Sequence, residues 1–299
     1  MNRFAAAPFP ARRLGSVQRQ NDQQVSAKPK LGQNFLRDPQ AAQRIVAALG
    51  DLAGRTVVEI GPGHGAITEV LASRAAHVVA IELDRALAFE LRHRFPPERV
   101  TVIEQDVLQF DFAAVAAQAG MRLQVAGNLP YYITSPILFH LAASHAALDL
   151  AVLMVQREVA DRVTAAPGSR DYGVLSVAVQ AHGPADPLFT LPPSAFSPPP
   201  DVHSTVFRWR LAPRFAELQI QGEPFLRFVR QAFAQKRKTL ANNLRAAGFD
   251  SQEAASAMQA AGIEPMARTE SLSIEALANL WRGLPPPHRH QAPEPGQRG

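Results

Sequence analysis

The 299-residue sequence contains no cysteine. Such a chain has no disulfide framework, no thiolate metal site and no cysteine nucleophile. Its nine histidines do not cluster at the spacing of metal ligands, so we expect no bound metal. No apolar run approaches the roughly 20 residues that a membrane helix needs, so we expect no membrane partner.

Acidic residues are missing from the start of the chain, where four arginines precede Asp22. A mitochondrial transit peptide has this bias, but prolines at positions 8 and 10 oppose the amphipathic helix of such a peptide. We therefore predict a disordered extension over residues 1–27 and a cytoplasmic protein. Residues 285–299 are rich in proline and glycine and predict a disordered tail.

Hydrophobic residues make up 46% of the chain, which is enough for a substantial core. From Lys28 onward, β-branched runs alternate with helix-like segments, and Asp38-Pro39 is typical of a helix start. This alternation predicts an α/β domain over residues 28–211 with a mostly parallel, doubly wound sheet. The last two strands are expected to form an antiparallel pair at one edge. The expected strands are Thr56–Ile60, His77–Ile81, Val100–Ile103, Leu123–Ala126, Ala151–Val155, Asp186–Leu191 and Ser204–Arg210.

After Leu211 the strand signals stop, and residues 212–284 predict a small all-helical domain. Gly248 and Gly262 suit C-terminal caps between its helices. The expected helices are Glu223–Ala247, Ser251–Ala261 and Ser273–Gly283.

Positive charge is concentrated in one part of the chain. The net charge is +5, yet residues 201–245 alone hold nine basic and three acidic residues. A local excess of this kind indicates a polyphosphate surface more than a general solubility charge would. Lys236, Arg237 and Lys238 lie in this segment, and a solvated helix face is the alternative interpretation.

A glycine-rich loop follows the first predicted strand. Gly61, Gly63 and Gly65 let the backbone turn sharply and approach a ligand closely. The loop lacks the later glycine of a dinucleotide fingerprint, and Pro62 removes an N–H that a pyrophosphate would use. Alone, the loop is equally consistent with an ordinary strand-to-helix turn.

Acidic residues at the next two strand ends favour a nucleoside ligand. Glu82 ends the second strand, where a carboxylate can accept both hydroxyl protons of a ribose. Asp106 follows the third strand and could accept a hydrogen bond from an adenine amine, although a helix-start aspartate is the alternative. Three successive strand ends with suitable groups indicate one ligand site along this rim.

The fourth predicted strand runs into Asn128-Leu129-Pro130-Tyr131. The exocyclic amine of adenine is a poor nucleophile, because its lone pair is delocalised into the ring. The Asn128 side-chain oxygen and the Leu129 carbonyl could accept its two hydrogens and favour a pyramidal nitrogen. Pro130 fixes the turn, and Tyr131 offers a face on which an extruded base can stack.

These segments together resemble the ribosomal RNA adenine dimethylase family, from about Lys28 to Trp281. The resemblance implies a Rossmann-like, S-adenosylmethionine-dependent methyltransferase that dimethylates adenine N-6. It is greatest to family members that modify two adjacent adenosines near the 3′ end of small-subunit ribosomal RNA, in a small-subunit particle. We expect the chain to act as a monomer. The matching segments are Leu31–Leu36, Glu59–Gly65, Ile81–Asp84, Gln105-Asp106, Asn128–Tyr131, Phe196–Ser204 and Gln235–Leu244.

The resemblance also implies roles for single residues. It places Phe196 against the target base, opposite Tyr131, whereas composition alone favours a core position for this phenylalanine. It places Lys236, Arg237 and Lys238 on a basic helix that contacts ribosomal RNA. The cofactor contacts that it implies, with the second loop glycine added, are Asn34, Leu36, Gly61, Gly63, Glu82, Asp106 and Asn128.

Three alternatives compete with this hypothesis. A sister enzyme of the family acts on large-subunit RNA, but the segment Lys236–Asn243 and the long helical C-terminus argue against it. A ribosome-assembly factor could keep the fold without turnover, yet every expected site residue is present. A nicotinamide dehydrogenase disagrees with the glycine spacing and leaves Asn128–Tyr131 unexplained.

Overall fold

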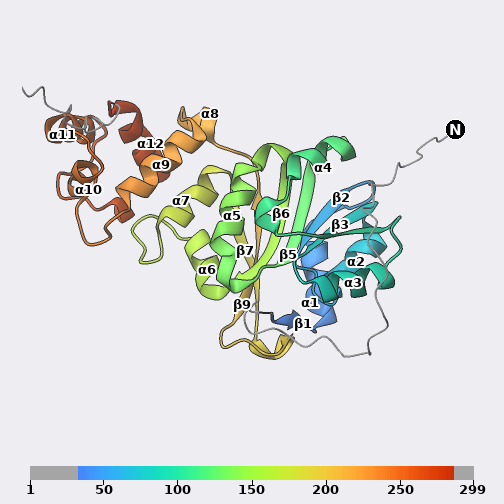
Figure 1. Ribbon diagram of the computed structural model, residues 1–299. Coiled ribbons are helices and arrows are strands. Elements are labelled where there is room, and N and C mark those ends of the chain that lie inside the picture. The colour runs from blue at the N-terminus through green and yellow to red at the C-terminus, as the bar shows by residue number, and fades with distance from the viewer. Residues whose placement is uncertain (1–32, 286–299) are drawn as a thin grey trace, which may run out of the picture.

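The computed structural model describes residues 33–285 and contains a seven-stranded sheet with the order β4-β3-β2-β5-β6-β9-β7 (Figure 1). The first five strands of this order are parallel, and β9 is antiparallel to both of its neighbours. A separate two-stranded ribbon pairs β1 with β8. The strands are β1 (Phe35–Leu36), β2 (Thr56–Ile60), β3 (His77–Glu82), β4 (Val100–Glu104), β5 (Leu123–Asn128), β6 (Leu148–Gln156), β7 (Ala185–Leu191), β8 (Phe196–Ser197) and β9 (Ser204–Arg210).

Helices cover both faces of the sheet because its strands are apolar on both faces. Val57 packs in one core cluster with α1 and α2, whereas its neighbour Val58 packs in another with α4, α5, α6 and α7. This alternation along β2 follows from the two-residue period of a strand. The helices of this part are α1 (Pro39–Ala47), α2 (Ala66–Arg74), α3 (Arg85–Arg94), α4 (Phe112–Ala119), α5 (Thr134–Ala143), α6 (Arg157–Val163) and α7 (Val174–Ala181).

The sequence predicted this sheet closely. Thr56–Ile60 and Ser204–Arg210 have the predicted bounds, and the other five strands extend one to three residues beyond them at one or both ends. The antiparallel edge pair is confirmed as β7 and β9. Asp38 caps α1 by accepting hydrogen bonds from the Gln40 and Ala41 amides, with Pro39 at the first helical position.

The C-terminal part is helical, as predicted, and lies beyond α7 at one end of the sheet (Figure 1). Gly248 and Gly262 follow two of its helices with positive φ angles, in agreement with their predicted capping role. The core of this part also contains Tyr172, Val177 and Ala178, from α7 and the preceding loop. The domain boundary at residue 211 therefore remains a prediction. Its helices are α8 (Phe215–Leu218), α9 (Gly222–Ala232), α10 (Leu240–Ala246), α11 (Ser251–Ala260) and α12 (Ile274–Gly283).

The single helix predicted over Glu223–Ala247 is wrong. α9 ends at Ala232, and α10 begins only at Leu240. In a continuous helix the Ala232 carbonyl would accept from the amide of residue 236; here it accepts from the side chains of Asn243 (2.7 Å) and Thr269 (2.6 Å). Side-chain capping thus ends α9 early.

The predicted tails fall mostly outside the described residues, as do Leu31 and Gly32 of the first family motif. Between residues 33 and 285, no helix combines the length and apolar character needed to cross a membrane.

We predict that Asn243→Ala lowers the free energy of unfolding by about 1 kcal/mol, because it removes one of the two side-chain hydrogen bonds that the Ala232 carbonyl accepts. The measurement is denaturant unfolding followed by circular dichroism. The control is Asn242→Ala, whose side chain accepts only from Arg245 at the surface, and which should change stability by less than about 0.5 kcal/mol. Equal effects of the two substitutions would contradict the capping role.

Candidate active site

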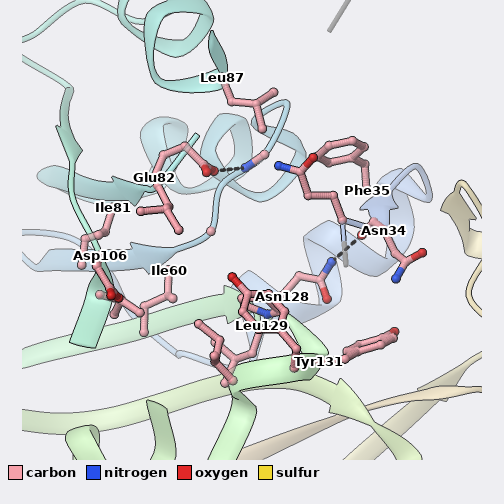
Figure 2. A pocket seen from close by; sticks show the side chains of 18 of the residues that line it. Asn34, Phe35, Ile60, Ile81, Glu82, Leu87, Asp106, Asn128, Leu129 and Tyr131 are labelled. Atoms are coloured by element: carbon pink, nitrogen blue, oxygen red, sulfur yellow. Dashed lines mark hydrogen bonds between the residues drawn. The ribbon is translucent and has the colours of Figure 1, made fainter. Parts of the chain in front are cut away.

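A pocket opens where the strand order of the sheet reverses, between β2 and β5. In open α/β sheets, ligands bind outside the carboxyl ends of the strands at this point. The pocket is open to solvent, and Figure 2 shows its side chains converging from both halves of the sheet. Its lining includes Asn34, Gly61, Gly63, Glu82, Asp106, Asn128, Leu129, Pro130 and Tyr131.

The glycine loop forms one wall of this pocket. Gly61 and Gly63 have φ angles of 65° and 58°, which glycine adopts without strain. A Cβ atom on Gly63 would lie 2.8 Å from the Phe35 ring, so the missing side chain also makes room for that residue. The loop therefore brings bare backbone to the ligand side and seats the N-terminal segment against it.

Glu82 lies at the end of β3 and is held by two backbone amides. Its Oε2 accepts from the Gly63 amide at 3.1 Å (Figure 2), and its Oε1 accepts from the Asp84 amide at 2.8 Å. Burial raises the pKa of Glu82 above its usual range, and the two amides oppose that shift. Each oxygen retains a lone pair, so the carboxylate can still accept from hydroxyl groups of a ligand.

A second carboxyl, that of Glu59, lies in β2, two residues before Gly61. Glu59 is buried, and its Oε2 has no hydrogen-bond partner within residues 33–285. Burial raises its pKa to about 8, and the nearby charge of Glu82 adds to that shift. A pKa of about 8 favours the protonated form of Glu59 at neutral pH.

Asp106 is the helix-start aspartate of the alternative interpretation, and its contact with a ligand remains a prediction. Its Oδ1 accepts from the Leu108 amide at 2.9 Å and so caps η2 (Val107–Gln109). The same residue lines the pocket, half-buried, on the rim beyond Glu82. A capping aspartate is thus also in place to accept from a ligand amine.

Asn128 ends β5 with its side-chain amide oriented by the N-terminal segment. Its Nδ2 donates to the Asn34 carbonyl at 2.8 Å (Figure 2). This bond fixes which end of the amide is which, since a carbonyl accepts only from the nitrogen. The opposite atom, Oδ1, is buried and has no hydrogen-bond partner among the described residues. An unpaired buried acceptor costs about 1–3 kcal/mol, which a donor on a ligand would remove.

Tyr131 follows two residues after the buried Leu129, in the short helix η3 (Tyr131–Ile133). Its ring lines the pocket, and its hydroxyl is hydrogen-bonded to the Ser204 hydroxyl at 2.6 Å. Burial raises the pKa of Tyr131, so its phenol is neutral at physiological pH. The flanking Pro130 has a φ angle of −62°, as its ring requires.

Three groups of predicted site residues lie outside the pocket lining. Phe196 is 4% exposed and packs in the core cluster of α1 and α2. Leu36 is its partner in the β1–β8 ribbon and is also buried. Lys236, Arg237 and Lys238 are exposed in the turn between α9 and α10, which corrects the predicted basic helix.

Several lining residues were not singled out from the sequence. Most of them lie inside the matching segments or next to a predicted site residue, and this position is the signal that could have found them. Leu87 is different: it reaches the pocket from the first turn of α3. These additional lining residues are Gln33, Phe35, Ile60, Ile81, Leu83, Leu87, Gln105, Val107, Tyr132 and Ile133.

The donor set of the pocket fits S-adenosylmethionine. Bare glycine backbone, the Glu82 carboxylate and the Asp106 carboxylate suit its nucleoside, and Asn128 offers an unpaired acceptor at the adjoining wall. Fold and site together define a Rossmann-like methyltransferase.

Comparison with known proteins gives the family. The family model of the ribosomal RNA adenine dimethylases matches residues 24–284, so the chain belongs to this family. It is accordingly an rRNA adenine dimethyltransferase that uses S-adenosylmethionine as methyl donor.

Relatives and solved structures agree with this assignment. Ribosomal RNA small subunit methyltransferase A of Acidobacterium capsulatum is 60% identical over 86% of this chain and 91% of its own length. The protein of the same name from Koribacter versatilis is 47% identical over 86% of this chain and 94% of its own. A 23S rRNA methyltransferase, ErmE, superposes with a TM-score of 0.64 at 25% identity, over 84% and 99% of the two chains. A dimethyladenosine transferase from Plasmodium falciparum shares the fold, with a TM-score of 0.67 at 24% identity, over 82% and 95%.

We predict that Glu82→Ala weakens S-adenosylmethionine binding by about 100-fold or more, because charge-assisted hydrogen bonds contribute about 1.5–3 kcal/mol each. Isothermal titration calorimetry measures this affinity. Glu104→Ala is the matched control: Glu104 ends the neighbouring strand β4 but pairs with Arg92 outside the pocket, and its loss should leave the affinity unchanged. RNA binding should persist in both variants, and an unaltered cofactor affinity of Glu82→Ala would refute the assignment.

Proposed function

We propose that this enzyme dimethylates the N-6 amines of two adjacent adenosines near the 3′ end of small-subunit ribosomal RNA. It acts in the cytoplasm, as a monomer, on a small-subunit particle during ribosome biogenesis. The names of the relatives at 60% and 47% identity support the small subunit over the large one, whose methyltransferase ErmE is only 25% identical. The observation that carries the proposal is the unpaired, oriented Oδ1 of Asn128 beside Leu129 in the pocket.

Asn128 and Leu129 are proposed to supply two hydrogen-bond acceptors for the adenine amine. The Oδ1 of Asn128 accepts a hydrogen bond from one N–H of the adenine amine, and the backbone carbonyl of Leu129 accepts one from the other N–H. Both acceptors favour a pyramidal nitrogen whose lone pair is directed at the methyl group. When bound, S-adenosylmethionine supplies an electrophilic methyl on a positively charged sulfur. No strong base is required, because the amine proton becomes acidic as the methyl arrives.

Aromatic stacking completes the proposed base site. Tyr131 already presents its ring to the pocket, held through its hydroxyl. The family resemblance assigns the opposite face to Phe196, which belongs to β8 and packs here in the core cluster of α1 and α2. Contact of Phe196 with the base therefore requires the ribbon to turn this ring toward the pocket when RNA binds.

We predict that incubation with under-methylated small subunits and labelled cofactor yields dimethyladenosine at two adjacent positions, detected by mass mapping of the RNA. Asn128→Ala should slow both methyl transfers by about 100–1,000-fold, the usual cost of removing one such acceptor or donor. Asn279→Ala, at an exposed position of α12, is the matched control and should retain the wild-type rate. Product on large-subunit RNA alone would refute the proposed substrate.

We also propose that the turn Lys236–Lys238 contacts ribosomal RNA. Several basic residues counted in the sequence are paired in the structure: Arg214 with Glu217 and Glu275, and Arg230 with Glu223. In contrast, the three residues of the turn are exposed and form no ion pair with any residue that the structure describes. Unpaired charge on an exposed turn suits phosphate contacts.

We predict that replacing Lys236, Arg237 and Lys238 by alanine reduces the slope of log affinity against log salt by about 0.7–0.9 per charge that contacts phosphate. Filter binding of small-subunit RNA over a range of salt concentrations gives this slope. Arg74→Ala, at the exposed end of α2, is the control and should leave the slope as in the wild type. An unchanged slope in the triple variant would exclude the turn from the interface.

A further inference from the structure

The first residue of β9 reaches the pocket rim because this strand is antiparallel. β6 ends at the rim with Gln156, and the register pairs Gln156 with Ser204. An antiparallel strand begins where its partner ends, so Ser204 lies at the level where the parallel strands present their ligand groups. Ser204 is completely buried, between Gln156 of β6 and Leu191 of β7.

The Ser204 hydroxyl is directed at one residue of the active site. Its Oγ lies 2.6 Å from the Oη of Tyr131, which is a short hydrogen bond between hydroxyl groups. Tyr131 is thus attached at both ends, by its backbone in η3 and by its hydroxyl to β9. A ring attached in this way has little freedom to swing about its χ1 and χ2 bonds.

We propose that Ser204 is a positioning residue that fixes the plane of the Tyr131 ring for the second methyl transfer. The inference rests on the proposed function, since it requires a base stacked on Tyr131. Ser204 does not touch the reacting atoms. It acts through the tyrosine hydroxyl, from β9, a strand that is far from Tyr131 in sequence and lies between β6 and the edge strand β7.

The second transfer depends on the ring more than the first does. An unmodified amine has two hydrogens for the acceptors at Asn128 and Leu129. A monomethylated amine has one, so one of the two orienting hydrogen bonds is lost. The base is then oriented to a larger extent by stacking, and a ring that is free to tilt permits more unproductive positions.

The test is Ser204→Ala in single-turnover assays that resolve monomethyl from dimethyl product. We expect the second transfer to slow about fivefold, which corresponds to roughly 1 kcal/mol for one neutral hydrogen bond. The monomethyl fraction should rise, while the first transfer and the cofactor affinity change little. Thr205→Val is the matched control: it removes a buried hydroxyl from the same strand, but one bonded to Thr190, and should leave the product ratio at the wild-type value.

A double-mutant cycle separates positioning from general destabilisation. Tyr131→Phe removes the same hydrogen bond from the other side and should raise the monomethyl fraction similarly, and Ser204→Ala in that background should add nothing. This variant also tests the inference if Ser204→Ala fails to fold. A wild-type product ratio in either single variant, or additive effects in the double variant, would overturn the inference. Failure of the proposed function differs from both, because the wild-type enzyme itself would then leave small-subunit adenosines unmodified.

Discussion

The close approach of β2 and β5 is the constraint on which the active site depends. A Cβ atom on Gly127 would lie only 2.6 Å from the Ile60 carbonyl, so a residue with a side chain there would force the two strands apart. With glycine, the strands pair in parallel up to Ile60 and Gly127, and the residues that follow, Gly61 and Asn128, emerge side by side. The glycine loop and the segment that begins at Asn128 are therefore neighbours because position 127 has no side chain.

The second condition is the orientation of a single amide. Asn128 is directed by the Asn34 carbonyl, which belongs to a segment nearly a hundred residues earlier in the chain. Phe35, beside it, packs over Gly63, so the same segment contacts both walls of the pocket. The segment of Asn34 and Phe35 thus connects the glycine loop to Asn128. A ligand donor that pairs with Oδ1 would remove the cost of leaving this buried acceptor unpaired, as expected of a preorganised group.

Most of the sheet and the cofactor rim were predictable from the sequence because their signals are local. A β-branched run followed by glycine or a carboxylate identifies a strand and its functional end within a few residues, as at Gly61 and Glu82. The break between α9 and α10 was not predictable, since it depends on Asn243 and Thr269 reaching back to Ala232 from elsewhere in the fold. A core position for Phe196 was predictable from composition and is confirmed by its burial. Its pairing with Leu36 was not predictable, because the two strands of the β1–β8 ribbon are too short to leave a pattern.

The same distinction between local and long-range structure applies to the groups that suit the cofactor and to those proposed to bind the RNA. The groups that suit the cofactor follow three successive parallel strands, so their relative positions are set by one repeated supersecondary unit. The proposed base site combines η3 with the antiparallel strand β9, and the proposed RNA turn is attached through α9, which packs against α7. Because α7 also packs on α5, the helix that follows Tyr131, the position of the basic turn relative to the pocket is set by a continuous apolar core. The position of the proposed RNA-binding residues therefore depends on long-range packing, whereas the position of the groups that suit the cofactor depends on local strand ends.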